Sequence, residues 1–390
     1  MFVATKGMAL ATTVTGSLPR PSWFTKNLAG RPFSVALGER AYREQYFDAL
    51  ASQIVDQTRA GLDILTDGDS RFDDDFAGRS WFAYVLERIG GMTEPHVSKH
   101  STAAARDKRP GDIMYEVVET RLPPYVDGPV TRGALEYARV WRSAQSLTQK
   151  PVKIGGISAG LVEGMTVNRH YKDRRDLIMD LSAVLNAEYH ELADAGAPVI
   201  QIEEPAIHGR VGIVDDPILT PEFYVKAFNA EVEGLRAKTE VWCHTCWGSP
   251  AAQRVEHADL SYAKAIPYLN QLAVDVLTFE GAENDGTDFE VIGKGVAKDK
   301  KIAIGVVNHR TLQVERPEEV AALVRKAMKW IEPERLILSS DCGFGRQGMS
   351  RLHALYKMVS LVRGANLVRR ELGLPEADVL VANPKFALID

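Results

Sequence analysis

The sequence predicts an α/β fold, a (β/α)8 TIM barrel, and three observations support this prediction. Short β-rich runs recur along the 390 residues, and segments with helical spacing of apolar residues lie between them. The runs are mostly apolar, which is typical of parallel strands covered by helices. There are eight such units, which indicates a closed barrel rather than an open sheet. The expected strands are 12–17, 62–68, 151–157, 198–204, 240–246, 274–280, 301–307 and 336–342.

The intervening segments carry helix signals, with one interruption. Residues 176–196 show helical spacing and end in a glycine, and residues 317–331 begin with a proline, which suits a first helical turn. Residues 93–139 are too polar and proline-rich for a core helix, and they contain VVETRLPPYVDGPV, which suggests a hairpin. We therefore expect a hairpin-like excursion over about 93–139, after the second strand, within a single domain spanning 1–390.

Composition excludes several classes of partner. The chain is 45% hydrophobic and 25% charged, and its net charge of −5 argues against a nucleic-acid-binding surface or a basic membrane-binding patch. No run approaches the length of a transmembrane helix, and the N-terminus lacks a convincing signal peptide. Three cysteines are too few for a disulfide framework. We expect a cytoplasmic protein with free thiols that binds neither nucleic acid nor membrane; a homo-oligomer stays open.

The stretch VWCHTCWGSP, residues 241–250, holds two of the three cysteines and one of the nine histidines. Side chains on a strand alternate between its faces, so His244 and Cys246 share one face and Cys243 points to the other. Cys243 is then expected to be a small buried hydrophobe. A redox pair of Cys243 and Cys246 would normally open a helix, whereas these residues lie on an expected strand. The pattern favours a His-x-Cys pair of metal ligands.

Two more zinc-compatible side chains end other expected strands. Glu280 ends VLTFE, and Cys342 follows LSSD. Taken singly, a buried strand cysteine or a lone histidine is more often inert core than ligand. Zinc needs three or four ligands, however, and barrel enzymes carry their chemistry at the C-terminal ends of the strands. Together these residues predict a catalytic zinc site.

With these motifs the chain resembles the catalytic zinc barrel of the cobalamin-independent methionine synthases and their shorter relatives. The resemblance runs in the family's order from TTVTGSLPRP through DGPVT, PVKIGG, IQIEEPA, HTCWG and FE to SSDCGFGRQG, and covers nearly the whole chain. It implies Zn²⁺ as cofactor, with His244, Cys246, Glu280 and Cys342 as its ligands. It also implies transfer of a methyl group to a small-molecule thiol such as homocysteine. The donor would be a folate, a methylated corrinoid protein or a small methylated compound.

The chain departs from the family's pattern in two respects. The large methionine synthases have a second, N-terminal barrel that helps to hold the folate, and 390 residues leave no room for it. The family's GE after the second strand is GD here (Asp69), and its IDEPA after the fourth is IEEPA (Glu203). The pocket would then hold homocysteine differently, or hold another thiol. Because the family includes epoxide-opening enzymes that act on coenzyme M, an alkyltransferase or lyase of the 2-hydroxypropyl-coenzyme M type is the alternative.

A zinc site with two thiolates suits chemistry at a substrate thiol. A coordinated thiol loses its proton to the metal, whereas a free thiol, with a pKa of about 8.5, is mostly protonated at neutral pH. The thiolate then attacks an alkyl carbon, and the leaving group needs a proton. His309, at the end of the seventh expected strand, is the candidate for this proton transfer, with a solvated loop histidine as the alternative. A barrel with a structural zinc and a binding role is a third hypothesis, in which metal removal would unfold the chain.

Four residues are candidates for binding the thiol substrate. Backbone amides at Gly16 and Ser17 are expected to bind its carboxylate or sulfonate. Asp69 and Glu203 are expected to hold its ammonium group. A cationic pocket at Arg20 or Arg71 would instead favour a sulfonated thiol.

Overall fold

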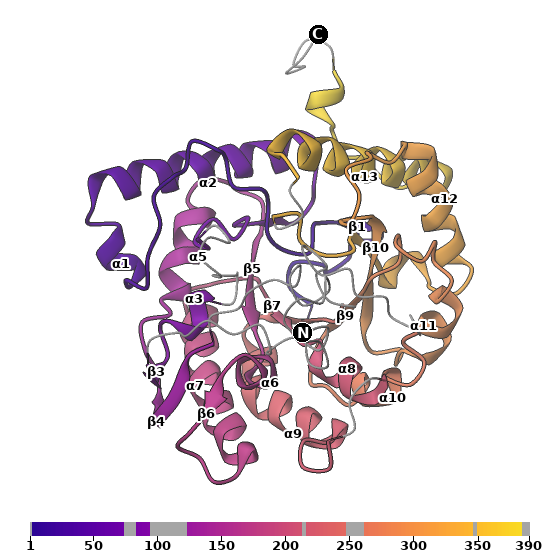
Figure 1. Ribbon diagram of the computed structural model, residues 1–390. Coiled ribbons are helices and arrows are strands. Elements are labelled where there is room, and N and C mark those ends of the chain that lie inside the picture. Colours follow the sequence, from indigo (N-terminus) through magenta and orange to yellow (C-terminus); the bar gives the residue numbers. More distant parts are fainter. Residues whose placement is uncertain are drawn as a thin grey trace, which may run out of the picture.

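Eight parallel strands form the centre of the molecule, and helices surround them (Figure 1). The computed structural model describes residues 2–73, 83–93, 123–212, 216–246, 261–345 and 349–383. In spatial order the strands are β1 (Ala11–Thr12), β11 (Leu336–Ser340), β10 (Lys301–Val307), β9 (Val276–Phe279), β8 (Glu240–His244), β7 (Val199–Glu203), β5 (Val152–Ile157) and β2 (Leu65–Thr66). Seven of them lie within strand segments expected from the sequence, and β1 overlaps the first expected segment, 12–17, only at Thr12.

Hydrogen bonds between the two ends of this order close the barrel. The backbone N–H groups of Asp63 and Ile64, just before β2, donate to the carbonyl of Thr12 on β1 at 3.0 and 3.1 Å. The Asp63 carboxylate in turn accepts from the backbone N–H and the hydroxyl of Thr12, both at 2.8 Å. The expected (β/α)8 barrel is thereby confirmed.

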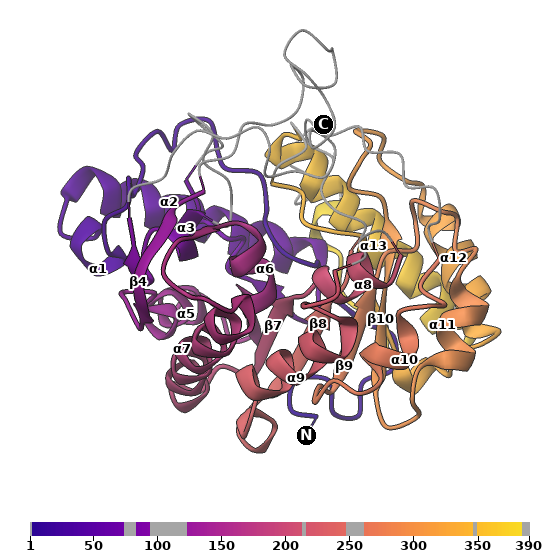
Figure 2. The same cartoon turned by 60° about the horizontal axis from the view of Figure 1, so that its bottom comes forward.

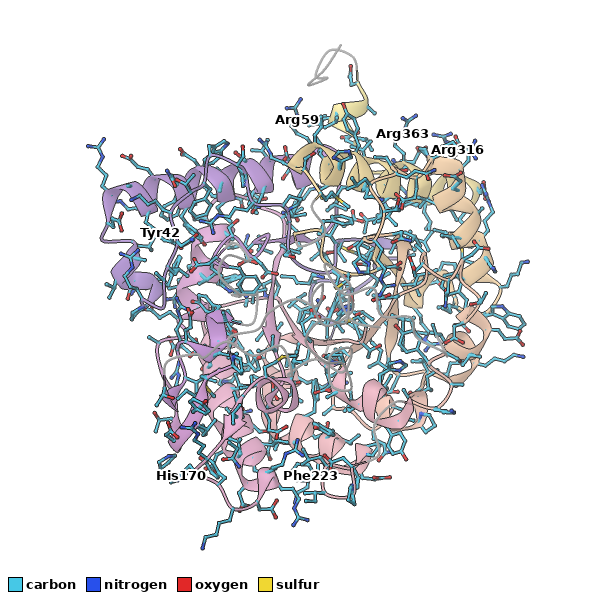
Figure 3. The ribbon with its side chains drawn as sticks, in the orientation of Figure 1. Tyr42, Arg59, His170, Phe223, Arg316 and Arg363 are labelled. Atoms are coloured by element: carbon cyan, nitrogen blue, oxygen red, sulfur yellow. The ribbon has the colours of Figure 1, made fainter. Side chains whose placement is uncertain are left out.

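A helix packs outside the barrel after each strand. In chain order the main helices are α2 (Arg40–Ala60), α5 (Tyr137–Gln145), α7 (Arg174–Asp194), α9 (Pro221–Glu231), α10 (Ile266–Leu269), α11 (Phe289–Gly295), α12 (Pro317–Met328) and α13 (Arg351–Glu371). Local signals set their ends: the Asp173 carboxylate accepts from the N–H of Arg175 at the start of α7, and Gly196 after its end has a φ of 103°. In Figure 3 the labelled side chains of Arg59, Arg316 and Arg363 lie at the outer edge of this helix layer. No helix in the described ranges is both long and apolar enough to cross a membrane.

Side chains of alternate strand residues build two apolar clusters, one inside and one outside the barrel. The inner cluster contains Trp242, Val276 and Ile337, whereas Cys243 belongs to the outer cluster between strands and helices. The N-terminal segment closes the inner cluster at the N-terminal ends of the strands (Figure 2): Glu240 at the start of β8 accepts from the backbone N–H of Thr5 at 3.1 Å. The opposite end, where the strands finish, forms the barrel mouth.

The expected excursion after the second strand is a small separate sheet. In it β3 (Gly90–Met92) pairs antiparallel with β4 (Tyr125–Thr131), and β4 pairs parallel with β6 (Val167–Asn168). This sheet begins slightly before residue 93, and residues 137–139 already belong to α5. The first part of the expected hairpin, residues 117–122, lies outside the described residues.

Candidate active site at the barrel mouth

Three side chains of types that can bind a metal ion meet where two strands end. His244 is the last residue of β8, Cys246 follows it by two residues, and Cys342 lies two residues after β11. One ligand atom of each lies within 4.8 Å of the others. In the sheet β8 and β11 are separated by β9 and β10, so the three residues reach one another across the mouth. We call His244, Cys246 and Cys342 the thiol cluster.

The imidazole of His244 is oriented as a metal ligand requires. Its Nδ1 hydrogen-bonds the hydroxyl of Thr278 on the neighbouring strand β9 at 2.6 Å, and its Nε2 has no hydrogen-bond partner among the described residues. Burial, with a contribution from the charge of Lys153, lowers the pKa of His244 to about 3, so the ring is neutral. A neutral ring with one nitrogen held by a hydroxyl and the other available is typical of metal-binding histidines.

The two cysteines of the cluster lie side by side. The pKa of Cys342 is raised well above its ordinary value, first because its thiol hydrogen-bonds Cys246 and then because it is buried. Sulfur and imidazole ligands suit zinc, and a metal that displaced the thiol protons would be bound with proton release. The donor chemistry of the thiol cluster, with the available Nε2 of His244, therefore fits a zinc ion.

Glu280 lies in a second group instead. Directly after β9, it has a ligand atom within 4.8 Å of those of His309 and Asp341, and we call these three residues the acidic cluster. Arg310 Nη1 lies 3.0 Å from Glu280 Oε2. Asp341 accepts three backbone hydrogen bonds of 2.7–2.9 Å from the N–H groups of residues 281–283. Both carboxylates of the acidic cluster are thus already bound by protein donors.

His309 is buried rather than solvated. None of its side chain is exposed, so the alternative of a solvated loop histidine is wrong. Burial, followed by the charge of Arg310, lowers the pKa of His309 well below its ordinary value. Within the part of the chain that the structure describes, neither ring nitrogen has a hydrogen-bond partner. The neutral ring therefore has one nitrogen ready to donate and one ready to accept a proton.

The turn at Gly16 and Ser17 packs directly on the loop that follows Cys342. The Ser17 carbonyl accepts from the backbone N–H of Phe344 at 2.7 Å and from that of Gly345 at 3.2 Å. A Cβ atom on Gly343 would lie only 2.6 Å from Ser17 Oγ, so this contact needs glycine. Gly16 borders Asp69, since a Cβ atom there would lie 3.6 Å from Asp69 Oδ2.

Asp69 is fixed by a buried arginine. It has a left-handed backbone, with a φ of 52°, and its Oδ1 lies 2.9 Å from Arg71 Nη1. The same nitrogen is 2.6 Å from Asp67 Oδ2, and Arg71 Nη2 donates to the carbonyl of Gly155 at 2.7 Å. Burial raises the pKa of Asp69 to about 7, although Arg71 opposes this shift. Arg71 therefore serves the two carboxylates and does not form an open cationic pocket.

Glu203 connects the thiol cluster with the interior of the barrel. It ends β7, its Oε2 lies 3.6 Å from His244 Nε2, and its Oε1 accepts from Gln201 Nε2 at 2.9 Å. Burial raises the pKa of Glu203 to about 8. The next residue, Glu204, is directed elsewhere, since its Oε1 accepts from the backbone N–H of Ile207 in α8 (Ala206–Gly212).

Residues missed in the sequence surround the expected ones. Thr278, Gln201 and Arg310 each contact an expected site residue, namely His244, Glu203 and Glu280. Thr278 and Gln201 lie two residues before Glu280 and Glu203, hence on the same strand face, and this spacing was the available signal. Arg310 follows His309 directly, and nothing in the sequence indicated which acid it contacts.

Comparison with known proteins identifies the family. Residues 10–363 match the catalytic domain of cobalamin-independent synthases. The methionine synthase of Saccharolobus solfataricus is 29% identical over 367 residues, which are 93% of this chain and 96% of that protein. The methionine synthase of Saccharolobus islandicus is 30% identical over 368 residues, again 93% and 96% of the two chains.

Solved structures agree in fold. The B12-independent methionine synthase from Shewanella sp. W3-18-1, in complex with selenomethionine, has a TM-score of 0.75 at 25% identity and covers 94% of this chain and 99% of its own. A putative vitamin-B12-independent methionine synthase from Listeria monocytogenes has a TM-score of 0.62 at 16% identity, with coverages of 91% and 96%. Since the family match extends over most of the chain, this protein is a methyltransferase that belongs to the cobalamin-independent methionine synthase family.

Proposed function

We propose that this protein transfers a methyl group to the thiol of homocysteine and so forms methionine, with Zn²⁺ at the thiol cluster. The observation that carries this proposal is the position of Glu203, which lies beside His244 and thus places a substrate acid next to a soft metal site. A thiol that also bears an ammonium group matches both features. Membership of the methionine synthase family supports the same reading.

The charges at the mouth favour an amino-acid thiol over a sulfonated one. Arg71 is buried against Asp67 and Asp69. Arg20 donates to the backbone carbonyls of Phe24 and Phe72, both at 2.8 Å. Among the described residues, therefore, Arg20 and Arg71 do not supply the cationic pocket that would favour a sulfonated thiol and the alkyl-transfer alternative.

His244, Cys246 and Cys342 would hold the zinc ion, with Glu280 as the fourth ligand that the family resemblance implies. Zinc bound there would lower the pKa of the substrate thiol and keep it as the thiolate. For Glu280 to take part, its carboxylate must loosen the contact with Arg310 that spans 3.0 Å.

Asp69 and Glu203 would bind the substrate ammonium, and the turn at Gly16 and Ser17 would bind the carboxylate. Asp69 Oδ1 is held by Arg71, while Oδ2 faces Gly16, so one carboxylate oxygen remains directed toward this turn. Backbone N–H groups at such a turn bind an anion without requiring a cationic side chain. Opposite charges on the two sides would orient the amino acid so that its thiol points toward the thiol cluster.

His309 would supply the proton that the methyl donor needs. The substrate sulfur forms a bond to the methyl carbon while the bond between that carbon and the donor breaks, and the electron pair leaves with the donor. The proton that the leaving group needs equals the one that the substrate thiol loses, and the neutral His309 ring would accept a proton on one nitrogen and donate one from the other to the leaving group. The burial of His309 excludes bulk water from this step.

Binding of matched thiols to cobalt-substituted protein tests the proposal. Homocysteine, 4-mercaptobutanoate (which lacks the amino group) and 2-mercaptoethanesulfonate are titrated while the cobalt–sulfur absorption is followed. We expect homocysteine to bind most tightly, and the zinc protein to form methionine from it with one of the candidate methyl donors, detected by mass spectrometry. Preference for the sulfonated thiol would overturn the proposal in favour of alkyl transfer. Unfolding upon metal removal, followed by circular dichroism, would instead indicate a structural zinc.

A further inference from the structure

A buried lysine, Lys153, lies beneath Asp69 and Glu203, the two acids proposed to bind the substrate ammonium, and it has no role in the proposed reaction. Lys153, on β5, is 1% exposed, and its Nζ lies 4.8 Å from the ring of Trp242 in the inner apolar cluster. Burying an ammonium group is costly unless specific partners compensate it. Its Nζ donates to Gln201 Oε1 at 2.7 Å and to the carbonyl of Thr15 at 3.4 Å. A charged group in this place therefore calls for a functional explanation.

Lys153 determines which way the amide of Gln201 points. In its charged form Lys153 can only donate hydrogen bonds, so Gln201 then presents its oxygen to Nζ. The amide nitrogen then faces the other side, where it donates to the Thr15 carbonyl at 2.7 Å and to Glu203 Oε1 at 2.9 Å. With the amide reversed, its oxygen would face the Glu203 carboxylate and the Thr15 carbonyl, which are both acceptors.

The same contacts reach the other substrate-binding element. Thr15 directly precedes the turn of Gly16 and Ser17, and its carbonyl receives hydrogen bonds from both Lys153 and Gln201. One lysine on β5 thus fixes the acid at the end of β7 and the turn at the end of β1. These elements are the ones proposed to bind the ammonium and the carboxylate of the substrate.

We propose that Lys153 is a positioning residue that acts through Gln201 to fix Glu203 and the turn at Gly16 and Ser17. It thereby makes the site selective for thiols that carry an amino group. This inference rests on the proposed function, because it assumes that Glu203 binds the substrate ammonium. Burial lowers the pKa of Lys153 to about 7, and the neighbouring charges of Glu203 and Asp69 oppose this shift.

The chain contains a matched control for a purely structural role. Lys301, at the start of β10, is also buried, and its Nζ donates to the backbone carbonyls of Thr5 at 2.6 Å and Met8 at 3.2 Å. Lys301 binds the N-terminal segment, at the end of the barrel opposite to the mouth. Replacing either lysine by methionine removes one buried ammonium group with little change in side-chain length, but only Lys153 lies beneath Asp69 and Glu203.

The experiment compares wild type, Lys153→Met and Lys301→Met as cobalt-substituted proteins. The dissociation constants of homocysteine and 4-mercaptobutanoate are measured from the cobalt–sulfur absorption, and metal content and Tm are recorded. We expect Lys153→Met to reduce the preference for homocysteine about tenfold, the lower end of the range for one hydrogen bond to a charged group, because Lys153 acts through Gln201. Its metal content should be unchanged, and 4-mercaptobutanoate, which keeps the carboxylate but has no ammonium group for Glu203, should be weakened less than homocysteine. Lys301→Met should lower Tm and keep the full preference.

Other results would contradict either this inference or the proposed function. A full preference in Lys153→Met, or an equal loss in Lys301→Met, would overturn the role of Lys153. Absence of any preference in wild type would instead refute the proposed function. If Lys153→Met does not fold, Gln201→Glu replaces it, because glutamate still accepts from Lys153 but turns an acceptor toward Glu203. This variant should fold and lose the preference; a Gln201→Glu variant that keeps it would also overturn the inference.

Discussion

Two groups of residues that could hold a metal ion lie at the mouth of one barrel, and their thiols and carboxylates differ in how far the protein already binds them. In the thiol cluster, His244 Nε2 has no hydrogen-bond partner among the described residues, and the two thiols have mainly each other. In the acidic cluster, Asp341 accepts three backbone hydrogen bonds, and Glu280 faces Arg310. Residue type alone would allow a metal at either group. The difference shows that the availability of lone pairs, more than the presence of ligand residues, distinguishes the two.

The largest expected effect distinguishes the two faces of strand β8. Cys342→Ser removes a soft ligand of the thiol cluster, so zinc affinity should fall by more than the roughly hundredfold that can follow loss of an outer partner of a metal site. Cys243→Ser should leave zinc content intact, because Cys243 lies in the outer apolar cluster. Metal analysis after dialysis against a chelator measures both. Equal zinc loss in the two variants would contradict the assignment of the thiol cluster.

These cysteines also show how far the sequence alone reaches. Short apolar runs between helical segments predicted the eight strands, and the alternation of side chains along a strand predicted the opposite directions of Cys243 and His244. Both signals are local in the sequence. The pairing of Arg310 with Glu280, and of Arg71 with Asp69, depends on loop conformation and on charges brought together by folding. From the sequence alone Arg71 could line a cationic pocket, and only its burial against two carboxylates shows that its guanidinium binds them instead.

A second prediction asks whether Asp69 and Glu203 act on the substrate and not on the metal. Asp69→Asn or Glu203→Gln should lower kcat/KM for homocysteine about tenfold to a hundredfold, as expected for loss of a charge-assisted hydrogen bond. Zinc content and the affinity for 4-mercaptobutanoate should not change. Zinc loss in either variant would show that the acid belongs to the metal site.

The pH dependence of thiol preference gives a sharper version of this test. Burial raises the pKa of Asp69 to about 7, so its carboxylate is protonated below and ionised above that pH. The preference for homocysteine over 4-mercaptobutanoate should therefore rise as pH increases through about 7, while ionisation of the thiol affects both ligands alike. In Asp69→Asn the part of this rise near pH 7 should disappear, whereas the part due to Glu203, whose pKa burial raises to about 8, should remain. A wild-type preference that is constant from pH 6 to about 8 would contradict the role of Asp69.

A smaller effect is expected from the residue that orients His244. Thr278→Val removes the hydroxyl that lies 2.6 Å from His244 Nδ1, so the ring loses its orienting hydrogen bond. Zinc affinity, measured by competition with a chelator, should fall about tenfold, at the lower end of the range for such outer partners. Thr278→Ser keeps the hydroxyl and should retain wild-type affinity. If serine and valine were equally damaging, packing of the threonine methyl group would be the cause instead.

The smallest effect is expected at Glu280 of the acidic cluster, the fourth zinc ligand that the family resemblance implies. To bind zinc, this carboxylate must weaken its ion pair with Arg310, whose Nη1 lies 3.0 Å from Oε2 and whose Nη2 donates to Oε1 at 3.5 Å. The loss of this ion pair therefore offsets most of the binding free energy that a contact between Glu280 and zinc would contribute. Glu280→Gln should accordingly lower zinc affinity by less than about tenfold. Arg310→Met removes the competing cation and should raise zinc affinity, because Glu280 then binds zinc without giving up an ion pair. Chelator competition measures both variants against Cys342→Ser. If Glu280→Gln lost as much zinc as Cys342→Ser, Glu280 would be a full ligand that releases Arg310 whenever zinc is bound, and the division between the two clusters would apply to the metal-free protein alone.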